Sequence, residues 1–150
     1  MFEIEKKGLN EIVIKTANRG IIFDLTQGLM MAELAVGVIE GPGEFEIGEA
    51  SIRGISVANH TKTIYGVDIN GVRIGLIGDF DENLDELGMP DILCTSSVKA
   101  IREVSPKLVI ATGNVDGMLT ELKLDAKLEK KVKIKRPEDL PSIQEVIVLN

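Results

Sequence analysis

The residues best suited to chemistry lie around Asp79, where an apolar run ends in carboxylates. The run from Val72 to Ile77 is followed by Gly78 and Asp79, and four more carboxylates precede Gly88. Carboxylate oxygens are the ligands that Mg²⁺, Mn²⁺ and Ca²⁺ prefer. The same pattern is also typical of a strand that ends in a solvated acidic turn. On residue types alone, the acidic turn is the favoured interpretation.

The chain has one histidine, His60, and one cysteine, Cys94. A zinc site usually takes three or four histidine and cysteine ligands, so these two cannot build one alone. His60 ends the predicted strand "SIRGISVAN", and catalysis by it would need a partner within hydrogen-bond reach. Cys94 lies in the apolar segment "DILCTS", which predicts a buried structural thiol rather than a nucleophile.

Length and charge restrict the class of protein. A chain of 150 residues is expected to form a single domain, 1–150, with one core. Its formal charge of −7 disfavours nucleic-acid and anionic-membrane partners. A single cysteine fits a reducing compartment, and the charged N-terminus "MFEIEKKG" is unlike a signal peptide, so we expect a cytoplasmic protein.

The first half of the sequence predicts antiparallel strands. Short strands are expected at "FEIEKK", "EIVIKT" and "GIIFDL", with turns at residues 8–10 and 18–20. "GPGEFEIGEASIRGISVANH" and "TKTIYGVDINGVRIGLIGD" are typical of hairpins, and Asn70-Gly71 fits a tight primed turn. Met30-Met31 and the apolar segment 34–39 are expected in a core or an interface.

The second half predicts helices mixed with strands. "DENLDELG" is expected to form one or two helical turns closed by Gly88. "DILCTS" and "KLVIATG" are predicted strands, and the second is expected to be buried on both faces. A helix is expected to join them, with Ser96 or Ser97 as its N-cap and its end before Pro106. Helical spacing continues from Met118 to Leu128. "KKVKIKR", with one wet lysine face suited to a sheet edge, and "QEVIVLN" are the last predicted strands.

The order of these pieces resembles the metallo-β-lactamase superfamily. The resemblance rests on "GPGEFEIGEASIRGI", "TIYGVDINGVRIGLIGDF", "PDIL", "SPKLVIATGN" and the closing "KVKIKRPEDLPSIQEVIVLN". Within that superfamily it is similar to the predicted zinc-dependent hydrolases related to ascorbate-6-phosphate lactonase. It implies an α+β (α/β) fold, a truncated metallo-β-lactamase-like sandwich of mixed β-sheets with a few flanking helices. The family hydrolyses lactones, phosphodiesters and other esters at a two-metal centre.

The resemblance also implies that most metal ligands are missing. The family's His-X-His-X-Asp-His motif should fall in residues 26–40, which contain no histidine and look shortened. Gly8-Leu9-Asn10 stands where close relatives have Gly-His-Ser, and the last family histidine is replaced near Gly113. His60 matches the third metal-binding region, and Asp79 matches the bridging aspartate of the "GD" motif. These two are the candidate metal ligands, as possible remnants.

Two functions from different classes follow. The first is a catalytically degenerate protein of this fold with a binding or structural role. It would have no catalytic residues and no cofactor. It would self-associate, because a Met- and Leu-rich segment replaces the metal motif. The alternative is a metal-dependent hydrolase of lactone or phosphoester bonds, with one divalent ion such as zinc on His60 and Asp79, completed by Asp81, water or a partner chain. A full-length relative is a further possible partner.

Overall fold

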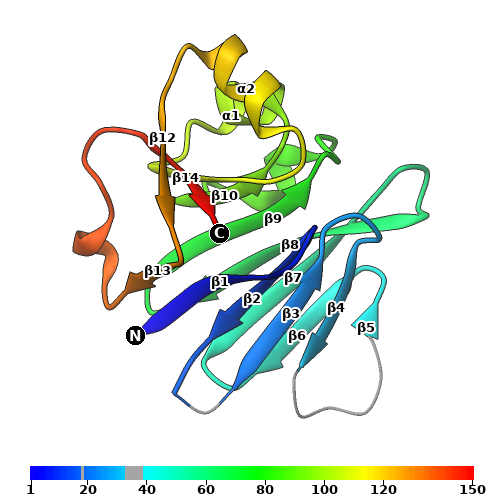
Figure 1. Ribbon diagram of the computed structural model, residues 1–150. Helices are drawn as coiled ribbons and strands as arrows, with labels where there is room; N and C mark the ends of the chain where they lie inside the picture. The colour runs from blue at the N-terminus through cyan, green and yellow to red at the C-terminus, as the bar shows by residue number, and fades with distance from the viewer. Residues whose placement is uncertain (18, 33–38) are drawn as a thin grey trace.

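A computed structural model describes residues 1–17, 19–32 and 39–150 of the chain. The described residues form two β-sheets and two α-helices (Figure 1). The six-stranded sheet has the order β13-β1-β2-β3-β4-β5, and the eight-stranded sheet has the order β12-β14-β11-β10-β9-β8-β7-β6. The predicted α+β sandwich of mixed sheets is therefore confirmed.

The six-stranded sheet is antiparallel throughout. Its strands are β1 (Phe2–Gly8), β2 (Glu11–Lys15), β3 (Gly20–Asp24), β4 (Leu29–Ala32), β5 (Ile39–Glu40) and β13 (Lys131–Ile134). The first three were predicted, as was the turn at residues 8–10. The turn predicted at 18–20 includes residue 18, and the apolar segment 34–39 includes 34–38, both outside the described residues. Met30 is buried in the core, as expected.

The eight-stranded sheet combines antiparallel hairpins with parallel strands. Its strands are β6 (Gly43–Ile47), β7 (Ala50–Val57), β8 (Lys62–Ile69), β9 (Val72–Gly78), β10 (Ile92–Thr95), β11 (Leu108–Ala111), β12 (Ala126–Glu129) and β14 (Glu145–Leu149). The β6–β9 part is antiparallel, whereas β9, β10, β11, β14 and β12 run parallel. Asn70 and Gly71 have φ of 52° and 77°, which confirms the primed turn between β8 and β9.

Helices cover the face of the eight-stranded sheet that lies away from the other sheet (Figure 1). They are α1 (Val98–Val104) and α2 (Val115–Leu122), with short 3₁₀ segments η1 (Leu84–Leu87) and η2 (Pro137–Asp139). Ser97 caps α1 by accepting a hydrogen bond from Ala100 N at 3.1 Å. Helical spacing over 118–128 was a wrong prediction, because the helix ends at Leu122 and residues 126–129 form β12. The left-handed Lys123 (φ 56°) ends the helix without the usual glycine.

Two apolar layers form the core. Alternate residues of β10 and β11 point to opposite sides: Ile92 and Ile110 pack between the sheets, whereas Leu93 and Val109 pack under the helices. The continuous apolar run of β11 is thus buried on both faces, as its sequence predicts. No helix in the described part of the chain combines the length and apolarity that a membrane span requires.

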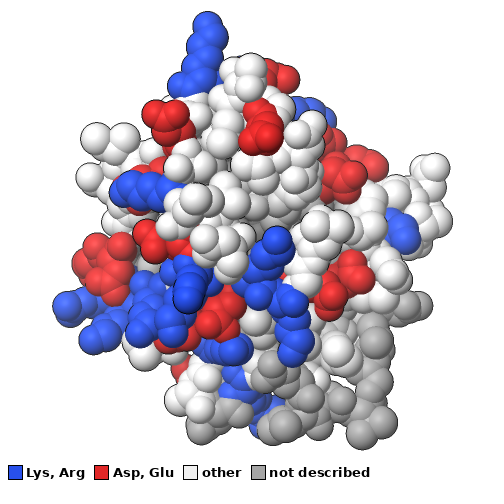
Figure 2. Space-filling model, in the orientation of Figure 1, with Lys and Arg blue, Asp and Glu red and all other residues white. Residues whose placement is uncertain are grey.

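Lysines line the free edge of the six-stranded sheet, as predicted. Among the described strands β13 pairs only with β1, and the exposed Lys131 and Lys133 lie 3.5 and 3.7 Å from carboxylate oxygens of Glu3. Figure 2 shows basic side chains gathered over this side of the molecule, with acidic ones among them. Such exposed charges discourage pairing with another strand at that edge.

The two sheets approach closely at the β3–β4 turn. A Cβ on Gly28, whose φ is 68°, would lie 2.5 Å from the backbone oxygen of Thr63 in β8. The Gly28 carbonyl accepts a 3.0 Å hydrogen bond from the Tyr65 hydroxyl, and the Tyr65 ring packs against Phe23 with centroids 5.5 Å apart. Glycine is therefore required here by both conformation and space.

We expect Gly28→Ala to lower the free energy of unfolding by about 3 kcal/mol, because it combines a left-handed backbone with a backbone clash. Gly41→Ala is the matched control, since Gly41 also has a positive φ (94°) but a Cβ there would have no atom within 4 Å. Its expected cost is about 1 kcal/mol, from the backbone alone. Chemical denaturation measures both. Equal losses would contradict the close approach of the two sheets.

Candidate functional site

The carboxyl ends of β9, β10 and β11 lie at one edge of the sandwich, together with the β1–β2, β3–β4 and β7–β8 turns. Leu25 N donates a 2.9 Å hydrogen bond to Asn10 O, which joins two of these turns. A Cβ on Gly78, at the end of β9, would lie 2.7 Å from Leu25 O in the other sheet. Parallel strands commonly place ligands beyond their carboxyl ends, so a site is expected at this strand-end edge.

His60 lies at this edge, in the turn after β7. It is the third of three successive left-handed residues, with φ of 66°, and its side chain is exposed. Its ring Nδ1 lies 2.9 Å from the hydroxyl oxygen of Ser56 on the preceding strand. One ring nitrogen is therefore used locally, and Nε2 is the one left for a ligand.

Asp79 is the first residue after β9 and is exposed. The neighbouring carboxylates hold the loop in place: Asp81 accepts a 2.7 Å hydrogen bond from the Ser97 hydroxyl, and Glu82 accepts one from Ala58 N at 3.3 Å. Asp81 was one of the groups expected to complete a metal site, beside water or a partner chain, and its carboxylate is bonded to the N-cap residue of α1. Among the described residues Asp79 alone of these three has no hydrogen-bond or ion-pair partner.

These residues do not form the ligand set of a metal centre. His60 and Asp79 lie at the same edge, because β8 runs antiparallel between the strands that carry them. Nevertheless, within residues 1–17, 19–32 and 39–150 no three His, Cys, Asp or Glu side chains are grouped so that they could hold one ion. Part of the span 26–40, which the resemblance assigns to the main metal motif, lies outside those ranges. The donor set that is described does not fit the family's two-metal centre.

Cys94 is fully buried in β10. Desolvation raises the pKa of its thiol to about 12, so the reactive thiolate is not formed at neutral pH. This environment agrees with the predicted structural thiol.

We expect the native protein to be inert to an aromatic disulfide reagent at pH 8, where a free cysteine of ordinary pKa reacts readily. The unfolded chain in guanidinium chloride should release one thiol per molecule, since the sequence has one cysteine. Absorbance of the released thiolate follows both reactions. Rapid labelling of the folded protein would contradict the burial of Cys94.

A cavity of about 270 Å³ opens between the two sheets at the strand-end edge. Its lining residues come from β1, β2 and the turn between them, from the end of β11 and the start of α2, and from β14: Lys6, Leu9, Asn10, Ile12, Ala111, Thr112, Gly113, Val115, Val148 and Leu149. We call it the inter-sheet cavity. Two of the positions that the resemblance links to lost ligands, residues 8–10 and Gly113, thus meet at one place. No histidine or carboxylate is among the described residues that line it.

Sequence reasoning did not identify Lys6 or Thr112 as site residues. A signal for Lys6 was present, because Phe2, Ile4 and Lys6 alternate onto one face of β1 and the first two are core residues. Lys6 pairs with the core residue Ile12 of β2, and cross-strand partners share a face. No comparable signal exists for Thr112, which comes to the cavity from the other sheet.

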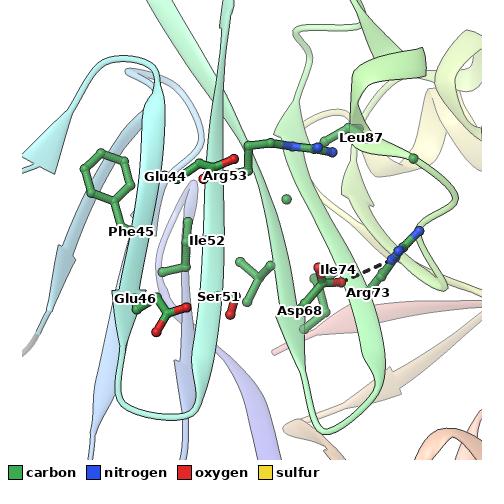
Figure 3. A pocket seen from close by; sticks show the side chains of 13 residues that line it. Glu44, Phe45, Glu46, Ser51, Ile52, Arg53, Asp68, Arg73, Ile74 and Leu87 are labelled. Atoms are coloured by element: carbon green, nitrogen blue, oxygen red, sulfur yellow. Dashed lines mark ion pairs between the residues drawn. The ribbon is translucent and has the colours of Figure 1, made fainter.

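A larger groove of about 590 Å³ crosses the outer face of β6–β9 (Figure 3). Its two arginines are already engaged: Arg53 donates to Glu86 O, and Arg73 Nε lies 3.2 Å from Asp68 Oδ1. Figure 3 shows this second pair and, from β6, Glu44 and Glu46 beside the groove. The charged groups here are exposed and of both signs. Solvent screens such charges, so they offer a charged ligand little binding energy.

Comparison with known proteins supports the fold. No model of a protein family matches the sequence, and no curated protein is detectably similar to it. The structure is similar to that of a candidate zinc-dependent hydrolase of the metallo-β-lactamase superfamily from Thermotoga maritima, with TM-score 0.73, 16% identity and 99% of each chain covered. The expected metallo-β-lactamase-like fold is therefore confirmed.

A second solved structure gives a weaker match. It is a candidate metal-dependent hydrolase from Parabacteroides distasonis ATCC 8503, with TM-score 0.45 and 12% identity, over 87% of this chain and 98% of that one. The comparisons thus establish the architecture of this chain, whereas its chemistry depends on the residues at its own site.

Proposed function

We propose that this chain is a non-catalytic protein of the metallo-β-lactamase-like fold whose strand-end edge binds a ligand. The observation that carries the proposal is the lining of the inter-sheet cavity. Leu9, Asn10 and Gly113 come together there, at the positions where the resemblance expects metal-binding motifs, and the cavity contains apolar side chains and hydrogen-bond donors instead of metal ligands. Hydrolysis at a two-metal centre needs most of its ligands to generate and clamp the attacking water.

The competing function is a hydrolase with a reduced site. His60 and Asp79 would hold one divalent ion, which would act as a Lewis acid and lower the pKa of a bound water. The hydrogen-bond contact of His60 with Ser56 and the use of Asp81 by Ser97 both count against this function. Two protein ligands are fewer than the three that catalytic zinc sites usually have.

Metal analysis separates the two functions. We expect protein purified without chelators to contain substoichiometric zinc, manganese and iron, because only two candidate ligands remain. Asp79→Asn should not change that content, and neither should the matched control Glu49→Gln in the β6–β7 turn at the opposite end of the sheet. Elemental analysis and titration calorimetry with Zn²⁺ measure it. Stoichiometric metal that disappears in Asp79→Asn but not in Glu49→Gln would establish the hydrolase instead.

We also propose that the chain self-associates through β12. This strand is the free edge of the eight-stranded sheet, and Leu128 on it is 69% exposed. Antiparallel pairing of two copies centred on Leu128 would place Lys127 of each copy opposite Glu129 of the other, so the edge is self-complementary. Unlike the lysine-lined edge at β13, β12 carries a large apolar side chain at its centre.

Sedimentation equilibrium tests this proposal. We expect the wild-type chain to dimerise with rising concentration and Leu128→Lys to remain monomeric, because the new charges would meet at the two-fold axis. Ile143→Lys is the control, since Ile143 is also 80% exposed but lies outside the strand. A monomeric wild-type protein at millimolar concentration would contradict dimerisation. Equal loss in both variants would exclude β12 as the interface.

A further inference from the structure

A cation lies at the rim of the inter-sheet cavity, because Lys6 lines the cavity and its side chain is exposed to solvent. Lys6 follows the core residues Phe2 and Ile4 on the same face of β1 and lies beside Ile12 of β2. Beyond Glu5 the β1 strand has no partner on the β13 side, so the sheet opens where Lys6 stands. In the described part of the chain Lys6 makes no ion pair. A solvated positive charge without a counter-ion among the described residues thus stands beside the apolar walls of the cavity.

A second polar group faces the same cavity from the other sheet. Thr112 is only 8% exposed, and its backbone N–H donates to Thr95 O at 3.0 Å. Its hydroxyl has no hydrogen-bond partner among the residues that the structure describes. Asn10 adds a side-chain amide at the mouth, while its backbone oxygen is taken by Leu25 N. Because this hydroxyl has no described partner, it is free to bond water or a ligand in the cavity.

The chemistry of the lining selects an anion with an apolar body. The polar side chains that line the cavity can all donate hydrogen bonds, and none of them is a carboxylate. One lysine balances one negative charge, which fits a carboxylate better than a doubly charged phosphate ester. Ile12, Val115, Val148 and Leu149 supply the apolar walls. A volume of about 270 Å³ equals that of about nine water molecules, so the ligand must be small.

We propose that the inter-sheet cavity binds a small aliphatic monocarboxylate, with its carboxylate on Lys6 Nζ and the Thr112 hydroxyl and its alkyl chain against the apolar walls. This inference rests on the proposed function, because it names the ligand class of the same strand-end edge. It requires no metal ion and no bond to be made or broken.

Titration calorimetry with straight-chain acids from butanoate to octanoate tests the proposal on the full chain. We expect saturable 1:1 binding with an optimum near hexanoate, because longer chains exceed the cavity. Hexan-1-ol should bind at least about tenfold more weakly, since it has no charge to pair with Lys6. Changes in the NMR chemical shifts of the Thr112 and Gly113 amides on ligand binding locate the ligand.

Variants assign the binding to the named side chains. Lys6→Met should weaken hexanoate binding at least about tenfold, whereas Lys6→Arg should retain most of it. Lys130→Met, which removes the same charge from the turn between β12 and β13, is the matched control and should bind like the wild type. Thr112→Val should reduce affinity a few-fold at nearly constant volume. Unchanged thermal unfolding of Lys6→Met shows that the fold is intact.

The outcomes separate this inference from the proposed function. Absence of saturable binding for every acid in the series overturns the inference, while the metal analysis decides the proposed function on its own. Equal affinity for hexanoate and hexan-1-ol, or equal affinity of Lys6→Met and wild type, also overturns the inference. Binding that requires added Zn²⁺ and is lost in Asp79→Asn overturns both.

Discussion

Burial of the central strands on both faces is the constraint on which the rest of this structure depends. β10 and β11 place alternate side chains in two apolar layers, one between the sheets and one under the helices. Because both faces of these strands are buried, polar side chains reach solvent only at the strand ends. Thr95 illustrates the limit: it is fully buried, and its hydroxyl donates to Gly78 O at 2.7 Å while accepting from Ser97 N. The strand-end edge is therefore where function has to be sought.

Close packing of the sheets determines which part of that edge is open. Around β8 and β9 the β3–β4 turn lies directly on the other sheet, with Gly28 and Gly78 allowing the approach and Tyr65 joining the layers. Around β11 the corresponding space is bordered by β1, Leu9 and Gly113, where the strand pairing of β1 with β13 has already ended. The inter-sheet cavity is thus a consequence of where the turns pack and where they do not.

Short-range sequence patterns predicted most of the helices and strands. The remaining features depend on contacts between residues far apart in the sequence. Asn70-Gly71 and the β10–α1–β11 unit followed from turn chemistry, a Ser97 cap and a continuous apolar strand. β12 was missed because Met118, Leu122 and Leu128 are near helical spacing, and a left-handed Lys123 ends α2 without a glycine or proline as a signal. The two-sheet arrangement came from the resemblance to a known superfamily, since pairing between distant strands leaves no mark in a single sequence.

The same distinction applies to the candidate site. A strand end rich in carboxylates was visible around Asp79, but sequence could not show which oxygens were already taken by the protein. Asp81 holds the Ser97 hydroxyl and Glu82 holds Ala58 N, so these carboxylates stabilise the loop. Lys6 and Thr112 present the opposite case, because they come from different sheets and neither is satisfied by a described neighbour.

A polar group whose partners are complete explains a fold, whereas one that is enclosed and lacks a partner requires something from outside the chain. Asp79 is exposed and therefore satisfied by water without any ligand. Thr112 is only 8% exposed, and Lys6 is exposed at the rim of a cavity with apolar walls. The donor groups that line the cavity, rather than the acidic strand end, are accordingly the feature of this edge that suits a ligand.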